Sequence, residues 1–231
     1  MAPKTPLTSG QLHFAILATD IALFTFRDGE LLVRLASVDR PPHFVDSKGL
    51  PGGLIKPAET AEKSVARIVS AKGGIDAKKI YMEQLYTFSD IDRDPRGRVV
   101  AVAYLALVPW EALSPAEQAN TPHEWWSPVR EARKLAYDHD IVLPMALKRL
   151  ASRIMYTTLI QKLLPREFTL SELERAYTSI LGTNLDKRNF RKKILKLKIL
   201  KALPHKRAGG AFRPAQLYRF ASEAVKEIQV L

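Results

Sequence analysis

The sequence predicts an α+β fold of two domains, a β-rich first domain at residues 1–140 and a basic second domain with a helix-turn-helix at residues 141–231. Three observations predict it. The 231 residues are enough for two ordinary domains with their own cores. Strand patterns dominate before residue 140 and helical spacing dominates directly after it. The net charge of +12 also divides there, because the first part carries 17 Lys and Arg against 18 Asp and Glu, and the second carries 19 against 6.

Composition narrows the class of protein. With 46% apolar and 26% charged residues, the chain falls among ordinary globular proteins. It has no cysteine, which excludes a disulfide framework, a thiolate metal site and a cysteine nucleophile. The longest apolar run, VVAVAYLALVPW, has 12 residues, whereas a membrane span needs ~20. We therefore expect a cytoplasmic protein with no membrane partner.

The first domain begins with a hairpin pattern. The run HFAILATDIALFTFRDGELLVRLA contains two β-rich segments joined by Asp28-Gly29, a turn typical of two-residue hairpins. The turn LPGG follows, and a helix is expected to begin between Ala58 and Thr60. The runs IYMEQLYTFSD and RVVAVAYLALV predict two more strands, separated by the Arg-rich loop DIDRDPRGR.

A long helix is expected at the domain boundary. In IVLPMALKRLASRIMYTTLIQKLL, apolar residues recur at 143, 147, 150 and 154, and again at 155, 159 and 163. This is helical spacing on a broad face, so we expect one helix over 141–164. It is either a connecting helix or the first helix of the second domain.

The second domain reads as helix, turn, helix. In FTLSELERAYTSILGTNLDKRNFRKKILKLKILKAL, Thr169 or Ser171 can cap the first helix, and Gly182 ends it. Asp186 is a fitting cap for the second helix. The tail KALPHKRAGGAFRPAQLYRF then predicts two short strands around a basic turn, which makes a winged helix-turn-helix.

The second helix has the two faces that a DNA-recognition helix needs. Phe190, Ile194 and Leu197 form an apolar stripe, and the basic side chains point the opposite way. Such a helix enters the major groove with its first residues at the base edges. The candidate DNA-binding residues are Thr169, Ser171, Lys187, Arg188, Asn189, Arg191, Lys192, Lys206, Arg207 and Arg213. The expected partner is double-stranded operator DNA bound by a homodimer, with duplex RNA or a merely solvated basic face as alternatives.

The stretch GLIKPAETAEKSVARIVSAKGGI, residues 53–75, resembles the Nudix box, which reads Gly, five residues, Glu, seven residues, then Arg-Glu-apolar-x-Glu-Glu-x-Gly-apolar. The positions that match the box are Gly53, Glu59, Arg67, Val69, Gly74 and Ile75. Three of its glutamates are replaced, by Ile68, Ala71 and Lys72. In an active member the three carboxylates would share one helix face and bind Mg²⁺.

Glu59 alone is a poor ligand set for metal-assisted attack of water on phosphorus. We therefore expect no catalytic residue, no metal site and no required cofactor, although a role for Mg²⁺ stays open. An ammonium can pair with phosphate as a point charge, so one hypothesis is that Lys72 partly replaces the metal and holds a pyrophosphate uncut. The alternative is a solvated helix lysine.

Two further runs, EQLYTFSDIDRDPRGRVVAVAYLALV and LAYDHDIVL, resemble the Nudix branch that handles ADP-ribose, and within it the NrtR family of transcriptional regulators of NAD metabolism. The segments DKRNFRKKI and RPAQLYRF resemble the DNA-binding domain of that family. The resemblance implies a Nudix α/β/α sandwich with a mixed sheet, followed by a winged helix. It also implies ADP-ribose or a related NAD metabolite as the effector, which releases the repressor from DNA.

The loop arginines can donate bidentate hydrogen bonds to a diphosphate, although such a loop can also be merely solvated. The candidate ligand-binding residues are Arg34, Gly52, Gly53, Glu59, Arg67, Lys72, Arg93, Arg96, Arg98 and His139. A lone histidine is more often structural, so His139 has that alternative too. The expected function is an effector-gated repressor of NAD-metabolism genes; the alternative is an ADP-ribose pyrophosphatase whose basic domain localises it.

Overall fold

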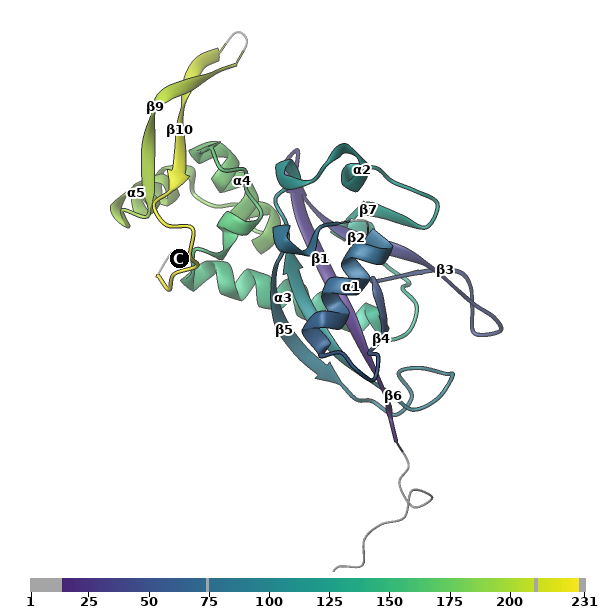
Figure 1. Cartoon of the computed structure of the whole chain (residues 1–231). Coiled ribbons are helices and arrows are strands. Elements are labelled where there is room, and N and C mark those ends of the chain that lie inside the picture. Colours follow the sequence, from purple (N-terminus) through teal and green to yellow (C-terminus); the bar gives the residue numbers. More distant parts are fainter. Residues whose placement is uncertain (1–13, 74, 210–211, 229–231) are drawn as a thin grey trace, which may run out of the picture.

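The computed structural model describes residues 14–73, 75–209 and 212–228, and its first domain is a seven-stranded mixed sheet (Figure 1). The strands are β1 (Ile16–Arg27), β2 (Glu30–Arg40), β3 (Phe44–Gly49), β4 (Gly52–Leu54), β5 (Tyr81–Phe88), β6 (Val99–Leu107) and β7 (Glu124–Pro128). Their main order is β3-β2-β1-β6-β5, with β4 paired to β1 and β7 paired to β2. Only the β1–β6 pair among them is parallel, so the α+β class with a mixed sheet is confirmed.

The Asp28-Gly29 hairpin is confirmed. Arg27 lies opposite Glu30, so the loop has two residues. Both take the left-handed conformation, with φ of 52° at Asp28 and 89° at Gly29. This backbone twist matches that of the flanking strands, which is why Asp-Gly is favoured there.

Helices cover both faces of the sheet, and β1 is therefore buried on both sides. Ala22 and Phe24 belong to the core on one face, under α3 (His139–Tyr156). Ile21 and Leu23 belong to a second core on the opposite face, under α1 (Ala61–Gly73). Successive side chains of a strand point to opposite faces, so the apolar run of β1 serves two layers. The remaining short helices here are η2 (Ala77–Lys79), η3 (Trp110–Ala112), α2 (Pro115–Gln118) and η4 (Val129–Glu131).

The prediction of one helix over 141–164 is wrong about where the helix begins and ends. Helix α3 begins at His139 and ends at Tyr156, and Thr157 is extended. The Thr157 hydroxyl donates to the Arg153 carbonyl and accepts from the Leu159 N–H, and these local bonds compete with the helix. The chain then forms the short helix η5 (Leu159–Lys162), and the Thr158 N–H bonds to the Lys226 carbonyl rather than continuing α3.

The C-terminal part is a winged helix-turn-helix. It comprises β8 (Phe168–Thr169), α4 (Leu170–Leu181), α5 (Lys187–Lys196), β9 (Leu200–Gly209) and β10 (Phe212–Phe220), with sheet order β8-β10-β9. Thr169, not Ser171, caps α4, and its hydroxyl accepts from the Glu172 N–H. Gly182 ends α4 at φ 65°, and Asp186 caps α5. The wing strands have 10 and 9 residues, longer than expected, and the tip at 210–211 lies outside the described residues.

One hydrophobic core runs through both parts of the chain. It joins Phe24 and Val33 of the sheet, Leu150 and Ile154 of α3, and Tyr177 of α4. The expected boundary between residues 140 and 141 therefore falls inside the first turn of α3, a helix that packs on both the sheet and α4. None of the described helices is both long enough and apolar enough to span a bilayer.

Candidate functional site

Gly52 and Gly53 allow β4 to lie close against β1 and α1. A Cβ on Gly52 would stand 2.6 Å from the Asp20 Oδ1 and 2.9 Å from the Thr19 carbonyl oxygen. A Cβ on Gly53 would stand 3.3 Å from the Ile68 Cδ1. The packing accounts for both glycines, and a role in ligand binding stays a prediction.

Glu59 and Arg67 form an ion pair at the start of the box. The Arg67 guanidinium donates to both carboxylate oxygens of Glu59, through Nε at 3.0 Å and through Nη2. It also donates to the Leu54 carbonyl at 2.9 Å, while the Lys56 N–H donates to Glu59 at 2.8 Å. Hydrogen bonding from Arg67 is the main reason that the pKa of Glu59 falls to about 2. These bonds connect β4 and the turn that follows it to α1.

The residues at the former glutamate positions do not fit a divalent cation. Ile68 is 1% exposed and lies in the apolar core with Ile21 and Val65. Ala71 is exposed, and the side chain of Lys72 lies outside the described part of the structure. Hard cations take oxygen ligands, and Glu59 is already bonded to Arg67. The hypothesis that Lys72 replaces the metal stays a prediction.

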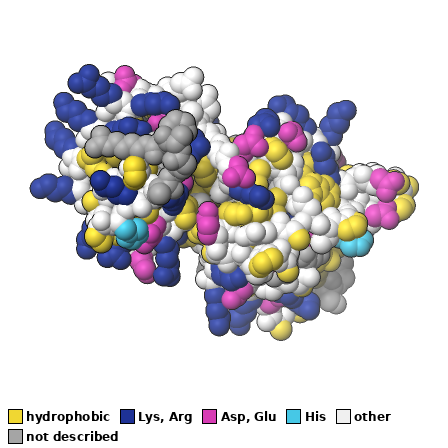
Figure 2. Space-filling model, turned by 90° about the horizontal axis from the view of Figure 1, so that it is seen from above, with side chains coloured by type: hydrophobic (Ala, Val, Ile, Leu, Met, Phe, Trp, Pro, Cys, Tyr) yellow, Lys and Arg dark blue, Asp and Glu magenta, His cyan; other side chains and the backbone are white. Residues whose placement is uncertain are grey.

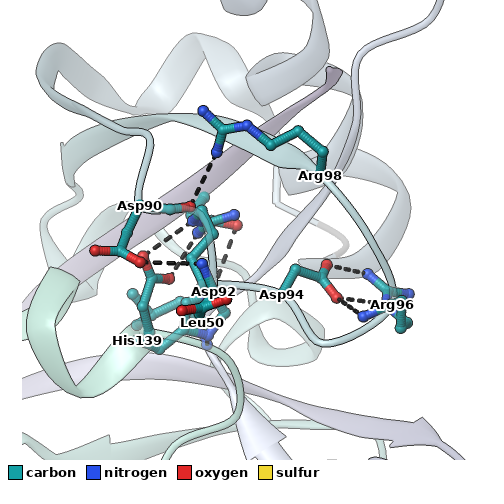
Figure 3. Close-up of polar contacts among 10 residues, drawn as sticks. Leu50, Asp90, Asp92, Asp94, Arg96, Arg98 and His139 are labelled. Atoms are coloured by element: carbon teal, nitrogen blue, oxygen red, sulfur yellow. Dashed lines mark hydrogen bonds and ion pairs between the residues drawn. The ribbon is translucent and has the colours of Figure 1, made fainter. Parts of the chain in front are cut away.

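The three arginines of the loop between β5 and β6 bond to the protein itself. Figure 3 shows two of them, Arg96 and Arg98, with their partners. Arg96 forms a bidentate pair with Asp94, at 2.9 and 2.7 Å, and its guanidinium lies 5.2 Å from the centre of the Tyr137 ring. Arg98 donates to the carbonyls of Ser89 and Asp90, which closes the loop. The Arg96 side chain remains 40% exposed, and its role in ligand binding stays a prediction.

Arg93 is buried between two carboxylates. Its Nε donates to the Asp138 Oδ2 at 2.9 Å, and its Nη2 donates to the Asp138 Oδ1 at 2.6 Å and to the Asp20 Oδ2 at 2.7 Å. Burial alone would raise the pKa of Asp20, but His139 and Arg93 hold it below its usual value. Likewise burial opposes the charge of Arg93, but Asp138 and Asp20 raise its pKa. The network joins β1, the loop and the start of α3.

His139 is 2% exposed and completes this network. Its Nδ1 accepts from the Leu50 N–H at 3.0 Å, and its Nε2 lies 3.5 Å from the Asp20 Oδ1. One ring nitrogen of His139 and one carboxylate oxygen each of Asp20 and Asp138 lie within 4.8 Å of one another, which is close enough for a shared metal ion. Arg93 bonds to both carboxylates, so a guanidinium stands where the charge of a cation would be needed.

Arg34 does not join this group. It is 3% exposed on β2, lies 3.6 Å from the Glu124 carboxylate, and has its guanidinium 5.2 Å from the centre of the Trp126 ring. These partners come from β7, the strand paired with β2. Its predicted role in ligand binding has no support in these contacts and stays a prediction.

The sequence reasoning missed Asp20 and Asp138 as partners of Arg93. A signal existed, since Asp20 is a charged residue within the apolar strand run ILATDIALF, and a buried charge needs a partner. Nothing in the sequence singled out Tyr137. In the structure its φ is 58° and its ring centre lies 4.4 Å from that of Phe44.

The basic side chains gather over the C-terminal part (Figure 2). On α5, Phe190 and Ile194 are buried, and the opposite face is exposed. The exposed candidates are Lys187, Arg188, Asn189, Arg191 and Lys192. Arg191 donates to the Ser171 hydroxyl at 2.9 Å, which joins α5 to the start of α4. The amphipathic pattern of this helix is thus as expected.

The wing is bonded to the start of α4. Arg207 donates to the Glu172 carboxylate and, at 3.1 Å, to the Glu167 carbonyl, while His205 lies 2.9 Å from the Glu167 carboxylate. Lys206 is exposed, and the Arg213 side chain lies outside the described residues. The contact of Arg207 with Glu172 places it at the capped end of α4, beside Thr169. Its DNA-binding role stays a prediction.

Two family models match the chain. The NUDIX domain model matches residues 16–146, and the model described as the NrtR DNA-binding winged helix domain matches residues 160–220. A curated protein of Acinetobacter baylyi, the ADPR responsive transcriptional repressor NtrR, is 35% identical over 211 residues, which are 89% of this chain and 82% of that protein.

Two solved structures are similar. The crystal structure of Shewanella oneidensis NrtR complexed with a 27mer DNA has a TM-score of 0.77 and 31% identity, covering 88% of this chain and 93% of that one. The NUDIX domain of the same protein, in complex with ADP ribose, has a TM-score of 0.53 and 32% identity, covering 62% of this chain and 94% of that one.

Proposed function

Since this chain belongs to the NrtR family of Nudix-related transcriptional regulators, we propose that it is a repressor that binds operator DNA and is released by ADP-ribose. The Nudix sandwich followed by a winged helix, expected from the sequence motifs, is confirmed. The operator belongs to genes of NAD metabolism, as the resemblance to the family implies. The repressor acts as a homodimer, because winged helix-turn-helix proteins commonly bind paired half-sites.

One observation carries this proposal. Within one chain, the Nudix helix has Ile68 buried at a metal-ligand position, while α5 presents an exposed basic face. A domain that keeps the Nudix fold but lacks three of the box carboxylates can bind a nucleotide diphosphate but has poor means to cut it. The basic helix supplies the phosphate contacts that dominate DNA affinity.

The test measures DNA binding and its response to ADP-ribose together. A fluorescent duplex from the region upstream of the gene is titrated with the protein at 100 mM salt, with and without ADP-ribose, and a scrambled duplex and an RNA duplex serve as controls. We expect the upstream duplex to bind at nanomolar to sub-micromolar concentration, at least ~10³-fold more tightly than the scrambled one. Added ADP-ribose should weaken that binding.

A second measurement addresses the alternative enzyme. The protein is incubated with ADP-ribose and Mg²⁺ or Mn²⁺, and AMP is quantified by chromatography. We expect no more than trace AMP. Rapid AMP formation together with equal affinity for upstream and scrambled DNA would refute the repressor and establish the pyrophosphatase.

A further inference from the structure

The loop between β5 and β6 is fastened to the first residues of α3 by the loop clamp, which we define as Asp20, Arg93 and Asp138. Arg93 comes from the loop, Asp138 is the residue before α3, and Asp20 lies on β1. Three hydrogen bonds of 2.6 to 2.9 Å join them. The Arg93 side chain is only 3% exposed, and those of both carboxylates are 9% exposed.

Because Arg93 is buried and Arg96 is exposed, the two arginines differ in what they can contact. Arg96 is 40% exposed in its side chain and available to a ligand, whereas a ligand can reach Arg93 only if the loop leaves α3. Removing one partner of a buried pair leaves an uncompensated charge in the interior, so such pairs strongly resist separation. Arg93 therefore connects the loop both to β1, through Asp20, and to the start of α3, through Asp138.

The far end of α3 is fastened to the DNA-binding part. Ile154 is fully buried, and its carbonyl accepts from the Tyr177 hydroxyl of α4 at 3.2 Å. Leu150 of α3 and Leu173 of α4 lie in the same core. Helix α4 in turn carries Thr169 at its cap, Ser171 bonded to Arg191 of α5, and Glu172 bonded to Arg207 of the wing.

We propose that the loop clamp transmits the effector signal, with Arg93 and Asp138 as positioning residues that convert movement of the ligand-binding loop into movement of α3 and α4. The proposal rests on the proposed function and names the residues through which that function is regulated. Effector binding shifts DNA affinity only through states in which both sites differ, and the loop clamp makes the loop and α3 change state together. The diphosphate contacts Arg96, whereas Arg93 stays on Asp138.

The test is the ratio of DNA dissociation constants with and without saturating ADP-ribose, measured by anisotropy for wild type and for Asp138→Asn. The amide keeps the shape of the side chain and removes its charge. The matched control is Glu117→Gln, since Glu117 of α2 is 6% exposed in its side chain and pairs at 2.7 Å with Lys79 of η2, so this pair does not include α3. We expect the control to keep the wild-type ratio, which for coupled sites is about 5 to 150. In Asp138→Asn the ratio should fall below about 2, while the dissociation constant for ADP-ribose changes less than about threefold.

Each other outcome decides a different question. If wild type responds to ADP-ribose and folded Asp138→Asn responds equally, the loop clamp does not transmit the signal. If Asp138→Asn instead loses ADP-ribose affinity more than about tenfold, the network belongs to the ligand site and the proposal is wrong. If ADP-ribose does not change the DNA affinity of the wild type, the proposed release by ADP-ribose is wrong, and the role of the loop clamp is wrong with it. Should circular dichroism show Asp138→Asn to be unfolded, Arg93→Lys replaces it, because an ammonium cannot form the bidentate bond.

Discussion

Removal of the Tyr177 hydroxyl should destabilise the whole chain by about 1–3 kcal/mol. The last carbonyls of a helix lack intrahelical partners, and α3 satisfies them from outside. The Ile154 carbonyl accepts from the Tyr177 hydroxyl, and the Tyr156 carbonyl accepts from the Ile228 N–H. Tyr177 is 1% exposed, so Tyr177→Phe removes a buried donor and leaves the Ile154 carbonyl without this bond.

The assay is urea unfolding followed by circular dichroism at pH 7. With an m-value of about 2–3 kcal/mol/M, the midpoint should fall by about 0.3–1.5 M. Tyr86→Phe is the matched control, because Tyr86 is 56% exposed, and its change should stay within about 0.5 kcal/mol. If the two variants had the same midpoint, the reasoning about the end of α3 would be refuted.

Three more predictions concern acid stability, the lost metal ligands and DNA contacts. Burial opposes the charge of Glu117, but Lys79 and backbone N–H groups lower its pKa from 4.5 to about 2. The Glu117 carboxylate therefore stabilises the fold above pH 4.5 and loses that effect as the pH falls towards 2, so urea midpoints of wild type and Glu117→Gln should converge between pH 6 and pH 2. Ile68→Glu puts a carboxylate into the core and should lower the free energy of unfolding by about 3 kcal/mol, or Tm by about 6–12 °C, in a thermal melt. The exposed Ala71→Glu should stay within about 0.5 kcal/mol, and a stable Ile68→Glu would contradict the buried position. Lys192→Ala should reduce the slope of log affinity against log salt by about 0.9 per lost phosphate contact, while Lys63→Ala on α1 should not, as titrations at several salt concentrations would show.

Local chemistry allowed much of the fold to be predicted. The Asp28-Gly29 turn needs left-handed backbone, which Gly adopts freely and Asp tolerates, so the sequence determines the hairpin within two residues. The faces of α5 follow from the spacing of Phe190 and Ile194. The end of α3 was missed because the apolar spacing continues past Thr157, whereas the hydroxyl bonds that stop the helix have no counterpart in periodicity.

The loop clamp could not be predicted for a different reason. Asp20 and Arg93 are 73 residues apart, and Arg93 and Asp138 are 45 apart, so only the complete fold brings these distant segments together. An arginine in a polar loop looks the same in sequence whether it faces a ligand or an interior carboxylate. Burial separates Arg93 from Arg96, and burial depends on the whole fold.

The shared core has a consequence for how the chain unfolds. Phe24 of the sheet, Leu150 of α3 and Phe190 of α5 belong to one apolar cluster, with no solvent layer to insulate the sensor from the DNA-binding helices. We therefore expect the Nudix and winged-helix parts to unfold together rather than as two independent domains. A ligand that binds only the native state then raises the melting temperature of every element at once. We therefore expect the melting temperature of the wing and of α5 to rise with the concentration of ADP-ribose.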